Sequence, residues 1–325
     1  MRKGRLSTWL CGIAVLVLAA PAQAAFPGAA GPLAYSRVTL DESVGSAGGL
    51  FAHGPRKRDR RVQLTDDTRD SSPSYSPNGR LIVFSGNRDG ARAPGSHIYV
   101  MRRDGSDVRQ LTGGELVDSN PSFSPDGRLV VFDRSEFANR TSHIFSVPLS
   151  GGEARQLTRG SNDDSDPVYA PNGRWIAFVS DRRRRARTDR SNIFSMRPNG
   201  SRVRLLIGGV RNEFDPDISP DGGKIVFASN RHRGPNLFVA HSDGKRVRAL
   251  TRSRGDCFRG TCYTNPSWAP DGKHIAFLAS GRYKSEIEVM RSDGRGRTVE
   301  FEGGGTEAEG FGTYVGPPSW GPRPR

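Results

Sequence analysis

Several features are scarce in this 325-residue sequence. Hydrophobic residues make up only 34% of it, which is low for a compact domain and leaves disorder as an alternative unless those residues are periodic. No Gly-x-Ser-x-Gly motif occurs, which excludes the nucleophile elbow of an α/β-hydrolase. The one apolar stretch of any length, Leu10 to Ala20, is too short to predict a membrane span.

Residues that bind metals or act as nucleophiles are also sparse. Only Cys257 and Cys262 follow the first 24 residues, and no histidine lies near them in the sequence, so they make a poor zinc ligand set. In an oxidising compartment the two cysteines are expected to form a disulfide. The six histidines are scattered, and no Ser/His/Asp set or Cys/His pair is visible.

The first 24 residues have the organisation of a signal peptide. Arg2, Lys3 and Arg5 form a basic start, the apolar stretch follows, and a small-residue cleavage motif ends at Ala24. We therefore expect cleavage near Ala24, export to the periplasm, cell envelope or exterior, and no transmembrane segment in the mature chain. Removal of the three basic residues lowers the formal net charge from +15 to +12.

A repeated motif dominates the rest of the sequence. It reads Pro, any residue, aromatic or Ile, Ser or Ala, Pro, Asp or Asn, Gly, with a truncated last copy at Pro318 to Pro322. A spacing near 50 residues in a strand-rich sequence is typical of radial β-repeats. The complete copies begin at Pro73, Pro121, Pro167, Pro216 and Pro266.

Each repeat predicts four strands. A β-branched and aromatic run such as Leu81 to Phe84 follows the Asx-Gly turn, a third run such as Ile98 to Met101 comes next, and a fourth run ends in Leu-Thr or a degenerate copy of it. Four antiparallel strands make one propeller blade, and the apolar residues fall on the positions where blades stack. The core is therefore periodic, and disorder is disfavoured.

The two ends of the repeat region predict six blades in a closed ring. Leu33 to Ser36 matches a second strand, whereas Pro318 to Pro322 matches only a first strand, so one blade is expected to combine both termini. Such closure removes an open sheet edge. With 40 Gly and 22 Pro and no break in composition, we expect one all-β domain over residues 25–325 after the signal peptide of residues 1–24.

These repeats resemble the PD40 (WD40-like) repeats of the six-bladed TolB propeller, the periplasmic component of the Tol-Pal system. The resemblance rests on the Ser-Pro-Asp-Gly turn, the Ile-Tyr-Val-Met strand and the Leu-Thr close over residues 33 to 322. It implies a six-bladed propeller with an exported binding role. It does not extend to the α/β domain that precedes the propeller in TolB, because only a few residues separate Ala24 from the first expected strand.

Propeller geometry sorts the loops into two faces. The long second-to-third strand loops and the blade-to-blade connections lie on one face, called here the loop face, and the short Asx-Gly and Gly-Gly turns lie on the opposite turn face. Variable loops on a rigid scaffold are where binding usually occurs. The connections place polar residues at the mouth of the central channel, and the binding candidates there are Asp118, Asn120, Asp164, Asp166, Glu213, Asp215 and Asn265.

Two interpretations of this channel-mouth set stay open. The Asp or Asn just before each Pro suits an Asx turn that caps the start of the strand, which applies to Asn120, Asp166, Asp215 and Asn265. Asp118 and Asp164 stand two residues earlier and suit a cation or a basic peptide. Ca²⁺ would be the natural metal, although no ordered Asp-x-Asp-x-Asp-Gly loop is present and no cofactor is otherwise expected.

The second-to-third strand loops carry the opposite charge and predict a basic rim around the acidic mouth. Few aromatic residues for base stacking lie among these arginines, so nucleic acid is not an expected partner. A protein or an anionic cell-envelope ligand is favoured, with a merely solvated rim as the alternative. The basic rim candidates are Arg182, Arg183, Arg184, Arg185, Arg231 and Arg233.

The sequence as a whole favours a non-catalytic binding scaffold that uses the loop face. The alternative is a divalent-metal-dependent hydrolase or lyase at the channel mouth, with Asp118, Asp164, Asp166 and Asp215 around the ion. The sequence identifies no catalytic residue outside that alternative, and it does not define the ligand or the oligomeric state.

Overall fold

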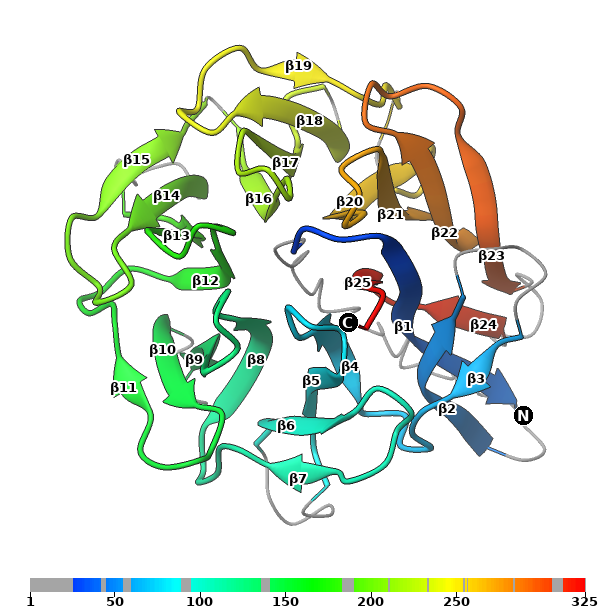
Figure 1. The fold of residues 1–325 in the computed structure, drawn as a ribbon. Helices are drawn as coiled ribbons and strands as arrows, with labels where there is room; N and C mark the ends of the chain where they lie inside the picture. Colours follow the sequence, from blue (N-terminus) through cyan, green and yellow to red (C-terminus); the bar gives the residue numbers. More distant parts are fainter. Residues whose placement is uncertain are drawn as a thin grey trace, which may run out of the picture.

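The predicted all-β, six-bladed propeller is confirmed by the computed structural model of the chain (Figure 1). The structure describes residues 26–41, 45–54, 60–88, 95–135, 141–182, 190–209, 211–232, 234–253, 255, 257–282, 284–305 and 312–324. Within these ranges every regular element is a strand, and no helix is long and apolar enough to cross a membrane. The expected signal peptide lies outside the described residues.

Blades 1 to 4 are separate four-stranded antiparallel sheets, each formed by consecutive strands. Their innermost strands are β4, β8, β12 and β16, and the chain moves outward through each blade (Figure 1). Blade 1 contains β4 (Ser71–Tyr75), β5 (Leu81–Gly86), β6 (His97–Arg102) and β7 (Arg109–Gln110). Blade 2 contains β8 (Val117–Phe123), β9 (Leu129–Ser135), β10 (Ser142–Pro148) and β11 (Arg155–Gln156). Blade 3 contains β12 (Asp164–Tyr169), β13 (Ile176–Ser180), β14 (Asn192–Met196) and β15 (Arg204–Ile207), and blade 4 contains β16 (Glu213–Ile218), β17 (Lys224–Ser229), β18 (Asn236–His241) and β19 (Arg248–Ala249).

Blade 6 combines the two ends of the chain, as the sequence predicted. Leu33 and Ala34 of β1 pair with Trp320 and Ser319 of β25. The blade contains β25 (Ser319–Pro322), β1 (Ala30–Asp41), β2 (Gly45–His53) and β3 (Val62–Gln63), and blade 5 contains β20 (Cys262–Trp268), β21 (His274–Gly281), β22 (Lys284–Arg291) and β23 (Thr298–Gly305).

One strand was not anticipated from the sequence. β24 (Gly312–Val315) pairs with β23 of blade 5 and with β1 of blade 6, and so joins these two blades into one continuous sheet. It departs from the repeat because it lies between the fourth strand of one blade and the first strand of the next. The ring is therefore closed by two connections to β1, through β24 and β25.

The Ser-Pro-Asx-Gly motif forms the first hairpin turn of each repeat. In blade 1 the Ser76 hydroxyl accepts a hydrogen bond from the backbone N–H of Leu81 at 2.9 Å and donates one to Asn78 at 2.8 Å. Gly79 has a φ of +67°, the left-handed region that favours glycine. The Asx-Gly pair thus recurs because of its local bonds and backbone, whereas alanine replaces the serine at Ala170 and Ala269.

The Leu-Thr close ends the fourth strand with a side-chain hydrogen bond. The Thr65 hydroxyl accepts the backbone N–H of Leu50 at 3.0 Å, and Thr112 accepts that of Ile98 at 2.9 Å. Each threonine thus extends a strand ladder that has only two paired residues. The same bond recurs at Thr158 and Thr251.

The core lies between neighbouring blades. One second-strand phenylalanine per blade is fully buried in five blades, and apolar clusters combine residues of adjacent blades. These positions are the periodic apolar residues of the sequence, so a low hydrophobic content suffices for stacking. The phenylalanines are Phe84, Phe132, Phe178, Phe227 and Phe277.

Candidate functional site

The innermost strands share an unusual backbone at the residue before the repeated proline. In blades 1 to 5 this residue has a positive φ between 50° and 57°, and each strand has a register shift next to it. Left-handed backbone costs about 1–2 kcal/mol for most residues and is best tolerated by Asn and Asp, whose side chains bond locally. The residues are Ser72, Asn120, Asp166, Asp215 and Asn265.

The side chains at these positions reach across blade boundaries. Asn120 of blade 2 donates from Nδ2 to Asp133 at 2.8 Å and to Asp166 of blade 3 at 3.0 Å. The backbone N–H of Asp166 also donates to Asp133, at 3.2 Å. On the next boundary but one, the Asp215 carboxylate accepts the backbone N–H of Asn265 at 2.9 Å.

The structure shows how one of these side chains bonds the backbone, and an Asx-turn cap at Asn120, Asp166 and Asn265 stays a prediction. Asp215 does accept a backbone N–H, but from the neighbouring blade, 50 residues away, and not from its own Asx turn. The β-bulge makes this possible, because it directs the side chain toward the next inner strand. The four recurring residues Asn120, Asp166, Asp215 and Asn265, together with Asp133, are called the inner ring below.

Burial perturbs the carboxyl groups of the inner ring. It raises the pKa of Asp133 to about 7, partly opposed by the hydrogen bond from Asn120, and it raises the pKa of Asp215 to about 7. The pKa of Asp166 is also well above its ordinary value, first because of burial and then because the Asp215 and Asp133 carboxylates are near. Burial thus raises the pKa of each of the three carboxyl groups of the inner ring.

Acidic side chains two residues earlier form a second layer, and an arginine pairs with each. Arg134 donates to Asp118 at 2.6 and 2.8 Å, and the carboxylate is fully buried. Arg182 donates from Nη2 to both carboxylate oxygens of Asp164, at 2.7 and 2.8 Å. The corresponding pairs are Arg88 with Asp70 at 2.5 Å and Arg231 with Glu213 at 2.6 Å.

Each of these arginines also lies over two aromatic rings of its own blade. The Arg182 guanidinium carbon is 5.1 Å from the Phe178 ring centre and 5.3 Å from that of Phe194. The distances in the other three blades lie between 5.0 and 5.6 Å, within the range of cation–π attraction. The acid, arginine and two rings form a repeated unit, called here the arginine clasp.

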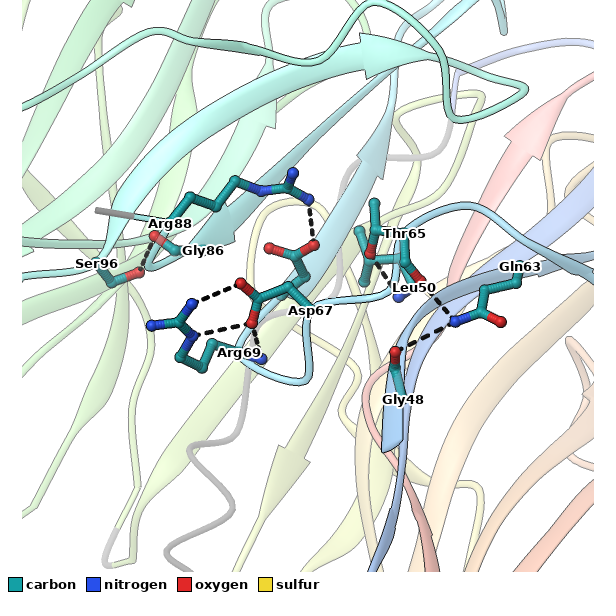
Figure 2. A network of polar contacts seen from close by, with 10 residues as sticks. Gly48, Leu50, Gln63, Thr65, Asp67, Arg69, Gly86, Arg88 and Ser96 are labelled. Atoms are coloured by element: carbon teal, nitrogen blue, oxygen red, sulfur yellow. Dashed lines mark hydrogen bonds and ion pairs between the residues drawn. The ribbon is translucent and has the colours of Figure 1, made fainter. Parts of the chain in front are cut away.

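Blade 1 shows the surroundings of one clasp. Figure 2 shows Arg88 beside a second pair, in which Arg69 holds Asp67 on the connection from blade 6 to blade 1. The Arg69 to Asp67 contact is 2.7 Å, and the Arg69 side chain is 45% exposed. This outer pair is solvated, whereas the acid of the clasp is completely buried.

These contacts revise the charge pattern expected for the loop face. Asp118, Asp164 and Glu213 were predicted to present charge at the channel mouth, and Arg182 and Arg231 to present charge on a separate rim. In the structure the two sets neutralise each other in the clasps. The reason is that an arginine at or just after the end of the second strand and an acid at the start of the first strand recur in these blades, where they meet at the same end of one hairpin.

The other predicted residues give the following outcome. Arg183, Arg184, Arg185 and Arg233 lie outside the described residues. The sulfur atoms of Cys257 and Cys262 are within bonding distance, with Cα atoms 5.2 Å apart, and oxidation of the pair stays a prediction.

The described residues contain no cluster of three or more His, Cys, Asp or Glu side chains arranged to hold a metal ion. Calcium at the channel mouth stays a prediction.

Two acidic residues, one on a second strand and one on an innermost strand, were missed. Asp133 of β9 bonds the inner ring, and Asp217 accepts the backbone N–H of Trp268 in the next blade at 2.6 Å. Both stand where other repeats have uncharged residues, such as Ser85 and Ser74. Comparison of the repeats position by position could have found them.

The fold and the repeats together define the class of protein: a six-bladed β-propeller of four-stranded blades. Residues 56–187 match the family model of the TolB beta propeller domain. The sequence matches none of the curated proteins with which it was compared.

Among solved structures, the chain is similar to TolB from Acinetobacter baumannii, with 20% identity and a TM-score of 0.69 over 90% of this chain and 67% of that one. It is also similar to Kuenenia stuttgartiensis hydrazine synthase, with 16% identity and a TM-score of 0.68 over 92% and 48%. An oligogalacturonate lyase from Vibrio parahaemolyticus shares 14% identity and a TM-score of 0.50 over 84% and 74%. At these identities the likeness shows the fold alone.

Proposed function

We propose that this chain is an exported, non-catalytic scaffold that binds a protein ligand on its loop face, over the inner ring. The likeness to TolB propellers supports a protein-binding role, and the leader-like residues 1–24 support export. An anionic envelope polymer is the alternative ligand, because the mature chain is strongly basic.

One observation carries the proposal. Five blades hold the residue before the proline in left-handed backbone, and strain of this kind persists where the surrounding structure fixes it, often at binding sites. The result is a set of amide and carboxyl groups held in position from several blades. Asn120 and Asp166 are its least buried members, at 9% and 8% exposure.

The arginine clasps support the same conclusion in another way. They hold the second strand of four blades against the first, so the loops of the loop face start from fixed positions. A partner then meets a preorganised surface, which lowers the ordering cost of binding.

Site-specific photocrosslinking in cells tests which face binds. A photoreactive amino acid would replace the exposed Arg69 or Arg211 on the loop face, and Asp104 or Asp243 on the turn face as matched controls. We expect one discrete adduct from the loop-face positions and none from the turn face. Adducts confined to the turn face would refute the proposal.

A second arm tests the inner ring. Asp166→Asn should reduce the loop-face adduct by at least tenfold, whereas Asp104→Asn should leave it unchanged. Elemental analysis of the same protein addresses the alternative function: a stoichiometric divalent ion, with hydrolysis or lyase turnover that EDTA abolishes, would favour the enzyme over the scaffold.

A further inference from the structure

The boundary between blades 5 and 6 contains a cavity of about 450 Å³ near the turn face. Blade 5 and blade 6 lie side by side at this boundary (Figure 1). The cavity is separate from the inner ring and the clasps. Its polar and aromatic lining consists of His53, Asp271, His274, Thr298, Glu300 and Trp320.

At the other five blade boundaries, apolar side chains fill the position that corresponds to this cavity. At each one, a buried apolar residue at the end of a third strand packs in one cluster with a leucine from the fourth strand of the preceding blade. The apolar residue is at most 1% exposed in all five cases. The pairs are Met101 with Leu64, Val147 with Leu111, Met196 with Leu157, Ala240 with Leu206 and Met290 with Leu250.

At the boundary between blades 5 and 6 both positions of this pair are polar. His53 occupies the third-strand position, since its neighbour Phe51 pairs with Gln63 as Tyr99 pairs with Gln110 in blade 1. Glu300 occupies the leucine position, directly before Phe301, and His53 and Glu300 both line the cavity. An apolar contact is thereby replaced by an imidazole and a carboxylate.

A third difference from the other blades, on the fourth strand of blade 5, leaves the cavity open. Thr298 pairs with Val289 at the position held by arginine in blades 1 to 4. Arg109 and Arg248, at that position, donate to backbone carbonyls of the following blade, Leu149 at 2.5 Å and Asp293 at 3.1 Å. Thr298 is too short to reach the following blade as Arg109 and Arg248 do, so this position of the described chain makes no such bridge.

Aromatic and acidic groups complete the cavity. The Trp320 indole is fixed by a hydrogen bond from Nε1 to the Gly31 carbonyl at 3.0 Å, and its ring centre is 6.4 Å from that of His274. Asp271 stands beside His274, with 4.0 Å between its Oδ2 and the imidazole Nδ1. Among the residues that the structure describes, the cavity lining contains no lysine or arginine.

We propose that this cavity binds a small organic cation, an ammonium or amine group with a short carbon chain. The Glu300 and Asp271 carboxylates supply negative charge, and the Trp320 ring offers an aromatic surface for cation–π contact. The volume lies within the range of about 300–1,000 Å³ that is usual for small-molecule sites. This site goes beyond the proposed loop-face function and does not depend on it.

Calorimetric titration of the mature chain with choline tests the proposal. Its uncharged carbon isostere, 3,3-dimethyl-1-butanol, and inorganic phosphate serve as comparison ligands. We expect saturable binding of choline, at least tenfold weaker binding of the isostere, and no binding of phosphate. Equal binding of the isostere would overturn the proposal, and so would preferential binding of phosphate. Absence of choline binding at concentrations up to about 0.1 M, which corresponds to less than about 2 kcal/mol of binding free energy, would also overturn it.

Variants locate the binding in this cavity. Glu300→Leu and Thr298→Arg restore the residues of the other blades, and each should weaken choline binding at least tenfold. Glu300→Gln keeps the shape of the side chain and should also weaken choline binding at least tenfold. This variant replaces Glu300→Leu in the test if Glu300→Leu fails to fold. Asp243→Asn, at the corresponding turn face of blade 4, is the matched control, and choline affinity that is unchanged in Glu300→Gln would refute the assignment.

Discussion

The arginine clasp of blade 3 makes a quantitative prediction about stability. Asp164 is fully buried and Arg182 is 19% exposed, so truncation of the arginine leaves a buried carboxylate without its partner. Breaking such a pair from one side costs about 3–5 kcal/mol. The two ring contacts of Arg182 add about 0.5–1 kcal/mol each at partly exposed sites. Against a typical total of about 5–15 kcal/mol, Arg182→Ala should be severely destabilising.

Urea unfolding followed by circular dichroism measures this effect. The urea concentration at the midpoint should fall, whereas the dependence of the unfolding free energy on urea concentration should stay constant. Arg174→Ala, an exposed arginine in the same blade, is the matched control and should change stability by less than about 0.5 kcal/mol. Replacing both partners, Asp164→Leu with Arg182→Met, should recover most of the loss, because two apolar groups leave no buried charge.

The result that would refute this reasoning is a small effect. If Arg182→Ala costs no more than about 1 kcal/mol, the pair behaves as a solvent-screened surface salt bridge. The clasp would then not fix the loop face, and Arg182 would be available to a ligand, as the sequence alone suggested.

Three further predictions follow from particular residues. Burial raises the pKa of Asp133 from 3.8 to about 7, so the folded state holds this proton more strongly than the unfolded state; its stabilising contribution is complete below pH 3.8 and is lost as the pH rises through 7. Unfolding measured from pH 4 to 8 should show that loss, to which Asp133 contributes a slope of at most about 1.4 kcal/mol per pH unit; Asp133→Asn should remove this share and leave the shares of Asp166 and Asp215. Reduction of the bond between Cys257 and Cys262 should lower stability by about 2 kcal/mol or less, because the closed loop is short; a larger loss in thermal melts would contradict this. Gly321→Ala should cost about 1–3 kcal/mol, because the added Cβ would lie 2.5 Å from the Tyr75 ring where the terminal strand closes the propeller, and an unchanged melting temperature would contradict it.

The sequence by itself determined the architecture. The Ser-Pro-Asx-Gly turn and the Leu-Thr close are local: Ser76 bonds residues within its own hairpin, and Thr65 bonds the adjacent strand. Local motifs repeated at a fixed period specify a blade, and six of them specify the ring. Even the mixed terminal blade was predictable, because Trp320 and Leu33 belong to recognisable first and second strands.

Only the tertiary structure decided the sites. Whether Arg182 faces solvent or Asp164 depends on which side of the hairpin each side chain takes, and the contact joins residues 18 apart. The inner ring joins residues 46 and 50 apart, across blade boundaries that no local pattern describes. The cavity lined by His53 and Glu300 joins residues near opposite ends of the chain. The burial of each side chain, and the charge that it leaves uncompensated, depend on these long-range contacts. Sequence reasoning could therefore identify the residues but not their partners.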